Sequence, residues 1–311
     1  MKEKLKNIIA KGIIALDESS NTMNRRLEAH DIELNLENRN LWRKIILTIP
    51  NLENYISGVI LYDETLKFLY EEGIISSLIK KGVSIGIKVD KGIYEYENKK
   101  RITLGLDDLD SRMQEYHSLG CKFAKWRAVF SLDDIDDSNI ELNIYHLAIY
   151  SIICLKYGVI PMVEPETLVL DGDHDINDSF EIMKGILQKL VQIFDLMNIP
   201  FENIILKINY VLPSKTRLNN YSNEDIITST IMLFEETLPD TLSNIAFLSG
   251  GLDPETATNL YRLIKQKDSS YNFTYSYGRA VQEEGLSIWR NAKENRVIQN
   301  TIQNRLKKLL N

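Results

Sequence analysis

Cysteine is scarce in this sequence, which has only two among 311 residues, Cys121 and Cys154. A scaffold held together by disulfides needs several cysteine pairs, so the class of small disulfide-rich secreted proteins is excluded. Each cysteine lies in an apolar stretch typical of a helix or a strand. We therefore expect both thiols to be reduced and buried in the core.

The sequence also lacks an excess of positive charge and any long apolar run. Lysine and arginine number 37 against 44 for aspartate and glutamate, a net charge of −7, whereas a general nucleic-acid surface needs clustered cations. The charged N-terminus is followed by an apolar run that ends by Lys11, too short for a signal segment or a membrane span. We expect a soluble cytoplasmic protein without a nucleic-acid or membrane partner.

Histidines spaced for zinc binding are missing as well, because His30, His117, His146 and His174 lie far apart. The loop 171–175, Asp-Gly-Asp-His-Asp, is the one cluster that suggests a metal. It lacks the spacing and the terminal glutamate of a calcium-binding EF-hand loop. We interpret it as a structural turn, with a metal site as the alternative, and we predict no metal or cofactor.

What the sequence does contain is an alternation of short apolar runs, rich in valine and isoleucine, with longer amphipathic stretches. This alternation is typical of βα units around a parallel sheet. Eight such runs favour a closed (β/α)8 TIM barrel, with residues 1–311 as one domain that carries extra N-terminal and C-terminal helices. The predicted strands are 12–17, 56–63, 83–90, 122–130, 159–166, 204–212, 245–251 and 273–279. The predicted helices are 40–47, 65–80, 107–119, 143–156, 179–197, 224–236 and 255–264, with terminal helices over 286–310.

Charged residues alternate with apolar ones inside these strands. In the sixth strand Lys207 and Asn209 flank Ile208, and side chains two positions apart on a strand share one face. Charges directed at the outer helices would lose water without gaining partners. We expect them to point into the barrel near its carboxyl end, where barrel enzymes have their active sites. The same pattern pairs Lys88 with Asp90, Lys125 with Arg127 and Glu164 with Glu166, and Asp17 ends the first strand.

Any one of these charges alone is more simply interpreted as a solvated surface residue. That interpretation fits poorly when five strands place ionisable groups at the same end. A barrel core held by salt bridges is the remaining structural alternative, although buried ion pairs stabilise a fold less well than apolar packing does.

Several cations around a few carboxylates in a dry pocket suit amine catalysis on a phosphorylated carbonyl compound. A lysine with the ordinary pKa of about 10.4 is rarely neutral at pH 7. Burial and cationic neighbours such as Lys125 and Arg127 would lower the pKa of a catalytic lysine towards about 7–8, so that its amine can attack a ketone. The iminium that results accepts electrons when an adjacent C–C bond breaks.

Two strand ends look suited to phosphate. The seventh strand ends in Ser249-Gly250-Gly251, whose small residues let backbone N–H groups approach an anion. The eighth ends in Ser276-Tyr277-Gly278-Arg279, which adds a guanidinium. Either segment alone is more often a plain turn, but phosphate sites after strands seven and eight are usual in this fold.

With these segments in place, the sequence resembles class I fructose-bisphosphate aldolase over nearly its whole length. The resemblance rests on the order and strand placement of segments 11–19, 86–92, 123–127, 163–166, 206–207, 247–251 and 276–279. It implies a lyase of glycolysis and gluconeogenesis that reversibly cleaves fructose 1,6-bisphosphate to dihydroxyacetone phosphate and glyceraldehyde 3-phosphate. It also implies that no metal is needed and that the protein is a homo-oligomer, commonly a homotetramer.

The resemblance further implies a role for each site residue. Lys207 would form a Schiff base with C2 of the sugar, and Glu164, supported by Glu166, would be the acid and base of carbinolamine dehydration. Asp17 would deprotonate the C4 hydroxyl while Lys125 stabilises the charge that develops beside it. The implied ligands are Ser249, Gly250, Gly251 and Arg279 around the C1 phosphate, and Ser19, Thr22, Lys88, Arg26 and Arg127 around the C6 phosphate. Ser276 and Gly278 are further expected substrate-binding residues.

Three departures from the family pattern are visible. Ile208 stands where proline is common, Thr22 stands where serine is usual, and no tyrosine follows Tyr277, although many relatives end in a tyrosine that assists proton exchange. The last departure bears on turnover and substrate range, and it leaves the Schiff base unaffected. Two other interpretations stay open: an aldolase for a related sugar such as sedoheptulose bisphosphate, and an aldolase-like protein with an additional binding or scaffold role.

Overall fold

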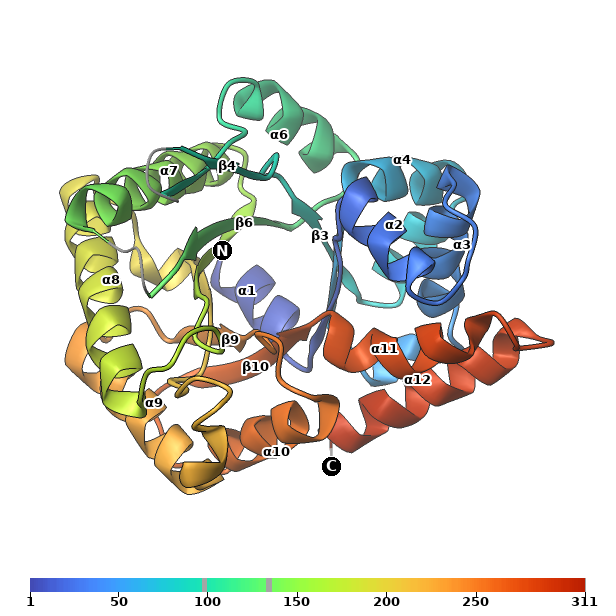
Figure 1. Cartoon of the computed structure of the whole chain (residues 1–311). Coiled ribbons are helices and arrows are strands. Elements are labelled where there is room, and N and C mark those ends of the chain that lie inside the picture. Colours follow the sequence, from blue (N-terminus) through green and yellow to red (C-terminus); the bar gives the residue numbers. More distant parts are fainter. Residues whose placement is uncertain (97–99, 133–135, 311) are drawn as a thin grey trace.

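A closed barrel of parallel strands forms the centre of the computed structural model, which describes residues 1–96, 100–132 and 136–310 (Figure 1). The barrel strands are β1 (Ile13–Leu16), β2 (Gly58–Leu61), β3 (Ser84–Lys88), β6 (Phe123–Phe130), β7 (Ile160–Thr167), β8 (Ile205–Ile208), β9 (Asn244–Phe247) and β10 (Asn272–Tyr277). They neighbour one another in chain order, and β10 closes the ring against β1. The eight predicted strands and the (β/α)8 barrel are confirmed.

Helices surround the barrel on its outside, as Figure 1 shows. They are α3 (Leu36–Leu47), α4 (Asp63–Glu71), α5 (Ile74–Lys80), α6 (Leu109–Ser118), α7 (Asp137–Lys156), α8 (Ile176–Leu196), α9 (Asn223–Thr237), α10 (Pro254–Lys265), α11 (Arg279–Trp289) and α12 (Asn295–Leu310). Short 3-10 turns cover Leu52–Asn54, Phe201–Asn203 and Leu218–Asn220. Within the described ranges, none of the helices is both long enough and apolar enough to span a membrane.

Several elements differ from the sequence prediction. The single helix predicted over 65–80 is two helices, because Gly73 has a φ of 72°, in the left-handed region that interrupts a helix. The terminal helices predicted over 286–310 begin earlier, at Arg279. Helices α1 (Lys2–Ile9) and α2 (Ser20–Glu28) and the hairpin of β4 (Ile93–Glu95) and β5 (Arg101–Thr103) had no predicted bounds.

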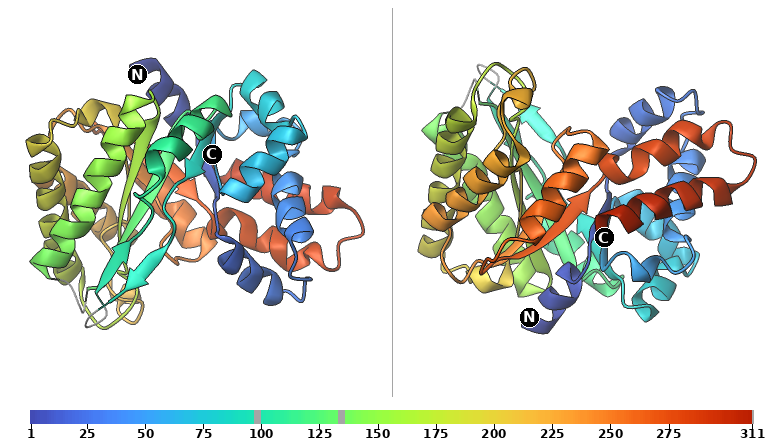
Figure 2. Two further views of the ribbon diagram at one scale, coloured as in Figure 1. Left: turned by 90° about the horizontal axis from the view of Figure 1, so that it is seen from above. Right: turned by 90° about the horizontal axis from the view of Figure 1, so that it is seen from below.

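The two ends of the barrel are chemically different. Leu5, Ile8 and Ile9 of α1 pack into the amino end, against inward-facing residues such as Phe123 and Met162. Figure 2 shows α1 at one end of the barrel and the β4–β5 hairpin at the other in both views. Because apolar side chains fill the amino end, water and a polar ligand have access to the interior from the carboxyl end.

Both cysteines are buried and free, as predicted. The loop 171–175 is a turn in which the side chains of Asp173 and Asp175 have protein partners. Asp175 caps α8 by accepting from the backbone N–H groups of Asn177 and Asp178, and Asp173 binds Arg217 with distances of 2.7 and 3.0 Å. These contacts give the aspartates the structural use that the turn interpretation requires.

Candidate active site

The carboxyl ends of the barrel strands surround a cavity of 910 Å³. Its wall includes most of the residues that the sequence analysis selected. Those on the wall are Asp17, Ser19, Thr22, Lys88, Lys125, Arg127, Glu164, Glu166, Lys207, Ser249, Gly250, Ser276, Gly278 and Arg279.

The period-two pattern explains why these charges meet. On four strands, the inward-facing residue two positions before the charge belongs to the apolar cluster at the amino end: Ala15 before Asp17, Phe123 before Lys125, Met162 before Glu164 and Ile205 before Lys207. Successive inward-facing residues of a strand are two positions apart, so the interior of the barrel changes from an apolar layer to a charged layer between one inward-facing residue and the next.

The centre of the charged layer is a row of ion pairs. The Glu164 carboxylate lies between two ammonium groups, 2.9 Å from Nζ of Lys207 and 3.0 Å from Nζ of Lys125. Lys125 lies in turn 2.7 Å from the carboxylate of Asp17. All four residues are at most 9% exposed, so these charges interact in a medium that screens them poorly.

The two buried lysines differ in their partners. Burial alone would lower the pKa of Lys125, but the charges of Asp17 and Glu164 outweigh it and raise the pKa above its usual value. Lys125 is therefore a fixed cation and a poor nucleophile. Lys207 forms its ion pair with Glu164 alone, among the residues described, and is the better placed of the two lysines for attack on a carbonyl.

The two carboxyl groups are held in their charged forms. Burial alone would raise the pKa of Asp17, but Lys125 and Lys207 outweigh it and lower the pKa below its usual range. Glu164 behaves in the same way, with Arg127 as a third cation that lowers its pKa. A carboxylate next to an ammonium group is positioned to accept its proton.

A second set of ion pairs lies closer to the rim. Nζ of Lys88 lies 2.5 Å from the carboxylate of Asp90 and donates to the Asp90 carbonyl oxygen at 2.8 Å. The guanidinium of Arg127 forms an ion pair with Glu166. Burial opposes the charge of Arg127, but Glu166 and Glu164 outweigh it and raise the pKa. Both cations face the cavity, where they can meet an anionic ligand.

The N-termini of two helices, α2 and α11, adjoin the cavity. Ser19 caps α2 by accepting from the N–H of Thr22 at 3.4 Å, and the first turn of α2 is part of the wall. Helix α11 begins at Arg279, directly after Gly278. Unpaired N–H groups at a helix start favour phosphate. The hydroxyl of Ser276 is buried without a hydrogen-bond partner in the described structure, which leaves it free for a ligand.

The placement of two residues, Arg26 and Gly251, differs from what the sequence suggested. Arg26 lies off the wall, because its guanidinium is bound by Glu18, Gln282 and Glu283, and Arg25 takes the wall position instead. Gly251 also lies off the wall, although its φ of 89° and the 51° of Gly250 shape the turn after β9. The wall further includes Asn21, Tyr62, Lys91 and Ile93, which carried no signal in the strand pattern.

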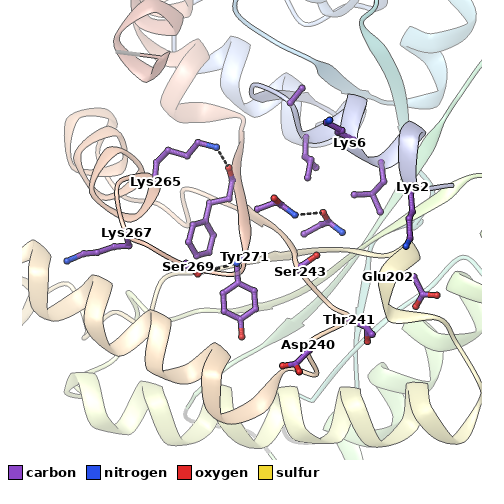
Figure 3. A pocket seen from close by; sticks show the side chains of 16 residues that line it. Lys2, Lys6, Glu202, Asp240, Thr241, Ser243, Lys265, Lys267, Ser269 and Tyr271 are labelled. Carbon is purple, nitrogen blue, oxygen red and sulfur yellow. Dashed lines mark hydrogen bonds between the residues drawn. The ribbon is translucent and has the colours of Figure 1, made fainter.

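Another cavity, of 840 Å³, lies at the amino end beside α1 (Figure 3). Its lysines do not form a comparable site. Lys265 donates to the carbonyl oxygen of Phe273 at 2.9 Å, and Lys267, which Figure 3 shows directed away from Lys2 and Lys6, pairs with Glu224. Every charged residue on this wall is exposed or half-buried. Of the two cavities, the one at the carboxyl end is therefore the one lined by buried charges.

Comparison with known proteins gives one consistent result. A family model described as fructose-bisphosphate aldolase class-I matches residues 2–309. A probable fructose-bisphosphate aldolase class 1 from Xanthomonas campestris is 39% identical over 286 residues, which cover 90% of this chain and 85% of the relative. A relative from Arabidopsis thaliana named fructose-bisphosphate aldolase 4, cytosolic, is 36% identical over 293 residues, which cover 92% of this chain and 74% of the relative.

The fold agrees with a solved structure as well. Fructose-bisphosphate aldolase from Plasmodium falciparum, in complex with TRAP and a small-molecule inhibitor, superposes with a TM-score of 0.92 at 30% identity. The match covers 99% of this chain and 92% of that one.

The buried charges predict how stability depends on pH. The folded-state pKa values of Asp17 and Glu164 lie below those of the unfolded chain, about 3.9 and about 4.3, so the unfolded chain binds these protons more tightly. Their stabilising effect is complete above about pH 5 and is lost as the pH falls towards the folded-state values. We expect the free energy of unfolding to decrease from about pH 5 to about pH 3. The Asp17→Asn variant should reduce that slope by up to about 1.4 kcal/mol per pH unit, the effect of one proton.

Denaturant unfolding at a series of pH values measures this slope. Asp240→Asn, which removes an exposed aspartate at the amino end of the barrel, is the matched control for loss of one acidic group. If Asp17→Asn kept the wild-type slope, the Asp17 carboxyl would not be held in its charged form by the two lysines.

Proposed function

The chain belongs to the class I fructose-bisphosphate aldolase family, and for this carbon–carbon lyase of glycolysis we propose a Schiff-base mechanism on Lys207. The enzyme reversibly cleaves fructose 1,6-bisphosphate to dihydroxyacetone phosphate and glyceraldehyde 3-phosphate. Its matched relatives are named for fructose bisphosphate, which favours this sugar over the sedoheptulose alternative. The observation that carries the mechanism is the Glu164 carboxylate 2.9 Å from the Lys207 amine inside the sugar-sized cavity.

The first step is attack of the Lys207 amine on C2 of the sugar. Glu164 takes up the proton that Lys207 must lose, which leaves a neutral amine and a protonated carboxyl in contact. After attack, Glu164 returns a proton to the C2 oxygen of the carbinolamine, and the oxygen leaves as water. The product is an iminium that links C2 to Nζ of Lys207. Glu166, held by Arg127, supports Glu164 from the rim.

The second step breaks the C3–C4 bond. Asp17 takes the proton of the C4 hydroxyl, the C4–O bond becomes the aldehyde carbonyl, and the electron pair of C3–C4 moves to the iminium to form an enamine. Lys125, 2.7 Å from Asp17, stabilises negative charge on the C4 oxygen during the transfer. Glyceraldehyde 3-phosphate leaves first. Protonation at C3 and hydrolysis at C2 then release dihydroxyacetone phosphate and restore the Lys207 amine.

The phosphates anchor the sugar on both sides of this centre. We assign the C1 phosphate to the ends of β9 and β10 and the start of α11, with Ser249, Gly250, Ser276, Gly278 and Arg279 as ligands. The C6 phosphate is assigned to the start of α2 and the rim, with Ser19, Thr22, Lys88 and Arg127. Arg25 replaces Arg26 in this second set because it is the arginine on the wall.

We also propose that the enzyme is cytoplasmic and that each chain is a single barrel domain within a homotetramer. The cytosolic name of the Arabidopsis relative supports the location. Helix α7 supports assembly, because Leu142, Ile149 and Ile152 are each about 40% exposed and lie within one side of the helix. Apolar side chains exposed together on a helix mark a surface for association.

Borohydride reduction in the presence of dihydroxyacetone phosphate tests the Schiff base. We expect a stable adduct on Lys207, found by peptide mass mapping, because reduction converts the C2 iminium to an amine that cannot hydrolyse. Lys207→Met should lose both the adduct and sugar cleavage, whereas Lys265→Met, at the far end of the barrel, should keep both. Labelling that disappears on chelation with EDTA, or an adduct that persists in Lys207→Met, would contradict the mechanism.

Light scattering tests the assembly. A homotetramer has four times the 35.9 kDa mass of the chain, and we expect that species in solution. Ile149→Asp should shift the mass downwards because it places a charge in the apolar side of α7, and Ser138→Asp, exposed at the start of the same helix, is the control. A wild-type mass equal to one chain would reject the oligomer.

A further inference from the structure

Asp17 occupies a position that the barrel itself does not secure. Strand β1 ends one residue earlier, at Leu16, which pairs with Leu61 of β2. On its other side the register with β10 ends at Ile14, paired with Tyr277. The backbone that carries the Asp17 carboxylate therefore leaves the sheet just where its position matters for the C4 hydroxyl.

Arg43 holds this backbone from outside the barrel. It lies on α3 and is completely buried. Its Nε donates to the carbonyl oxygen of Leu16 at 3.2 Å, and its Nη2 donates to the carbonyl oxygen of Glu18 at 2.6 Å. One planar guanidinium thus bridges the two carbonyl groups on either side of Asp17, a fixed two-point contact that a lysine cannot reproduce.

Gln282 of α11 adds a third contact to the same segment. Its Nε2 donates to the carbonyl oxygen of Ala15 at 2.8 Å, and its Oε1 accepts from Nε1 of Trp42 at 2.9 Å, which fixes the orientation of the amide. Gln282 is completely buried. Two helices that lie on the same side of the barrel in Figure 1 therefore bind the backbone around Asp17 through side chains.

Stability alone gives a poor reason for a cation at this place. A buried guanidinium loses its hydration, and its hydrogen bonds must offset that cost before it stabilises the fold at all. The nearest carboxylate oxygens lie 3.6 Å (Glu64) and 3.9 Å (Glu18) from the Arg43 nitrogens. The closer partners of Arg43 are carbonyl oxygens: those of Leu16 and Glu18, and that of Arg39 within its own helix at 3.4 Å. What Arg43 secures is the geometry of the segment that carries Asp17.

We propose that Arg43, assisted by Gln282, is a positioning residue that keeps the Asp17 carboxylate at Lys125, where it can accept the C4 hydroxyl proton. Arg43 does not contact the substrate in this arrangement. The inference rests on the proposed function, because it concerns the step that breaks the C3–C4 bond. The inference predicts that C3–C4 cleavage depends on Arg43 and that Schiff-base formation does not.

The test compares Schiff-base formation with C3–C4 cleavage in the variant Arg43→Lys. This variant keeps the positive charge and loses the planar guanidinium that binds two carbonyl oxygens at once. A catalytic group displaced by about 1 Å slows its step on the order of 100-fold, so we expect kcat for fructose 1,6-bisphosphate cleavage to fall by about that factor. KM should change less than kcat, because only Ser19 and Thr22 among the assigned phosphate ligands adjoin the segment that Arg43 binds. Borohydride trapping of dihydroxyacetone phosphate on Lys207 should stay at the wild-type level, since that step uses Lys207 and Glu164.

Arg39→Lys is the matched control. Arg39 lies one turn earlier on α3, and its side chain bonds Glu64 and Asn24 while leaving residues 15–18 untouched, so this variant should keep the wild-type kcat. Gln282→Met provides a second variant should Arg43→Lys fail to fold, with the same expected pattern of slowed cleavage and preserved trapping.

Equal kcat values in Arg43→Lys and Arg39→Lys would overturn the inference, and so would a parallel loss of cleavage and trapping. If Arg43→Lys does not fold and Gln282→Met does, a wild-type kcat in Gln282→Met would overturn the inference. An absence of trapping in the wild-type enzyme would reject the Schiff base itself and the inference with it.

Discussion

The carboxylate of Glu164, held between the ammonium groups of Lys125 and Lys207 inside the barrel, is the interaction on which the site depends. Two lysines so close together in a poorly screening medium would repel each other strongly, and one negative charge between them removes that repulsion. The same carboxylate is the nearest base to the Lys207 amine. A single residue therefore makes it possible to bury both lysines, and in the proposed mechanism it also accepts the proton of Lys207.

The rest of the molecule keeps this arrangement dry and in register. Apolar residues two positions before each charge, together with α1, fill the amino end of the barrel, so the ligand reaches the lysines from one side only. The Asp17 carboxylate binds Lys125, and side chains of α3 and α11 bind the backbone carbonyl groups of the neighbouring residues Glu18 and Ala15. The helices that start at Ser20 and Arg279 bring to the cavity the N-terminal N–H groups to which we assign the phosphates.

Much of this could be predicted because strands obey a simple period. The eight apolar runs predicted the barrel, and the spacing of two between Lys125 and Arg127, or between Glu164 and Glu166, predicted which side chains face the cavity. The period of two gave a wrong prediction for Asn209, which is two positions from Lys207 and was therefore expected to face the cavity. Its side-chain oxygen accepts from the N–H of Thr167, and it is not part of the cavity wall.

The helical and loop contributions could not be predicted in the same way. Arg25 and Arg26 are three and four positions from Thr22, and helical spacing allows both to share its face, so only the partners of Arg26 on α11 decide between them. Arg43 looks like a surface charge on an amphipathic helix. Its contact with the end of β1 depends on how α3 packs against the barrel, which no local pattern contains. The split at Gly73 follows from a positive φ, which a glycine permits but does not require.

The fate of the C2 oxygen tests the central claim most directly. Formation of an imine expels the carbonyl oxygen as water, and hydrolysis replaces it with oxygen from the solvent. Dihydroxyacetone phosphate labelled with ¹⁸O at C2 should therefore lose its label to ordinary water in the presence of the wild-type enzyme, faster than by uncatalysed hydration, and at only the uncatalysed rate with Lys207→Met. Retention of the label by wild-type enzyme that still cleaves fructose 1,6-bisphosphate would contradict a covalent bond between Lys207 and the sugar.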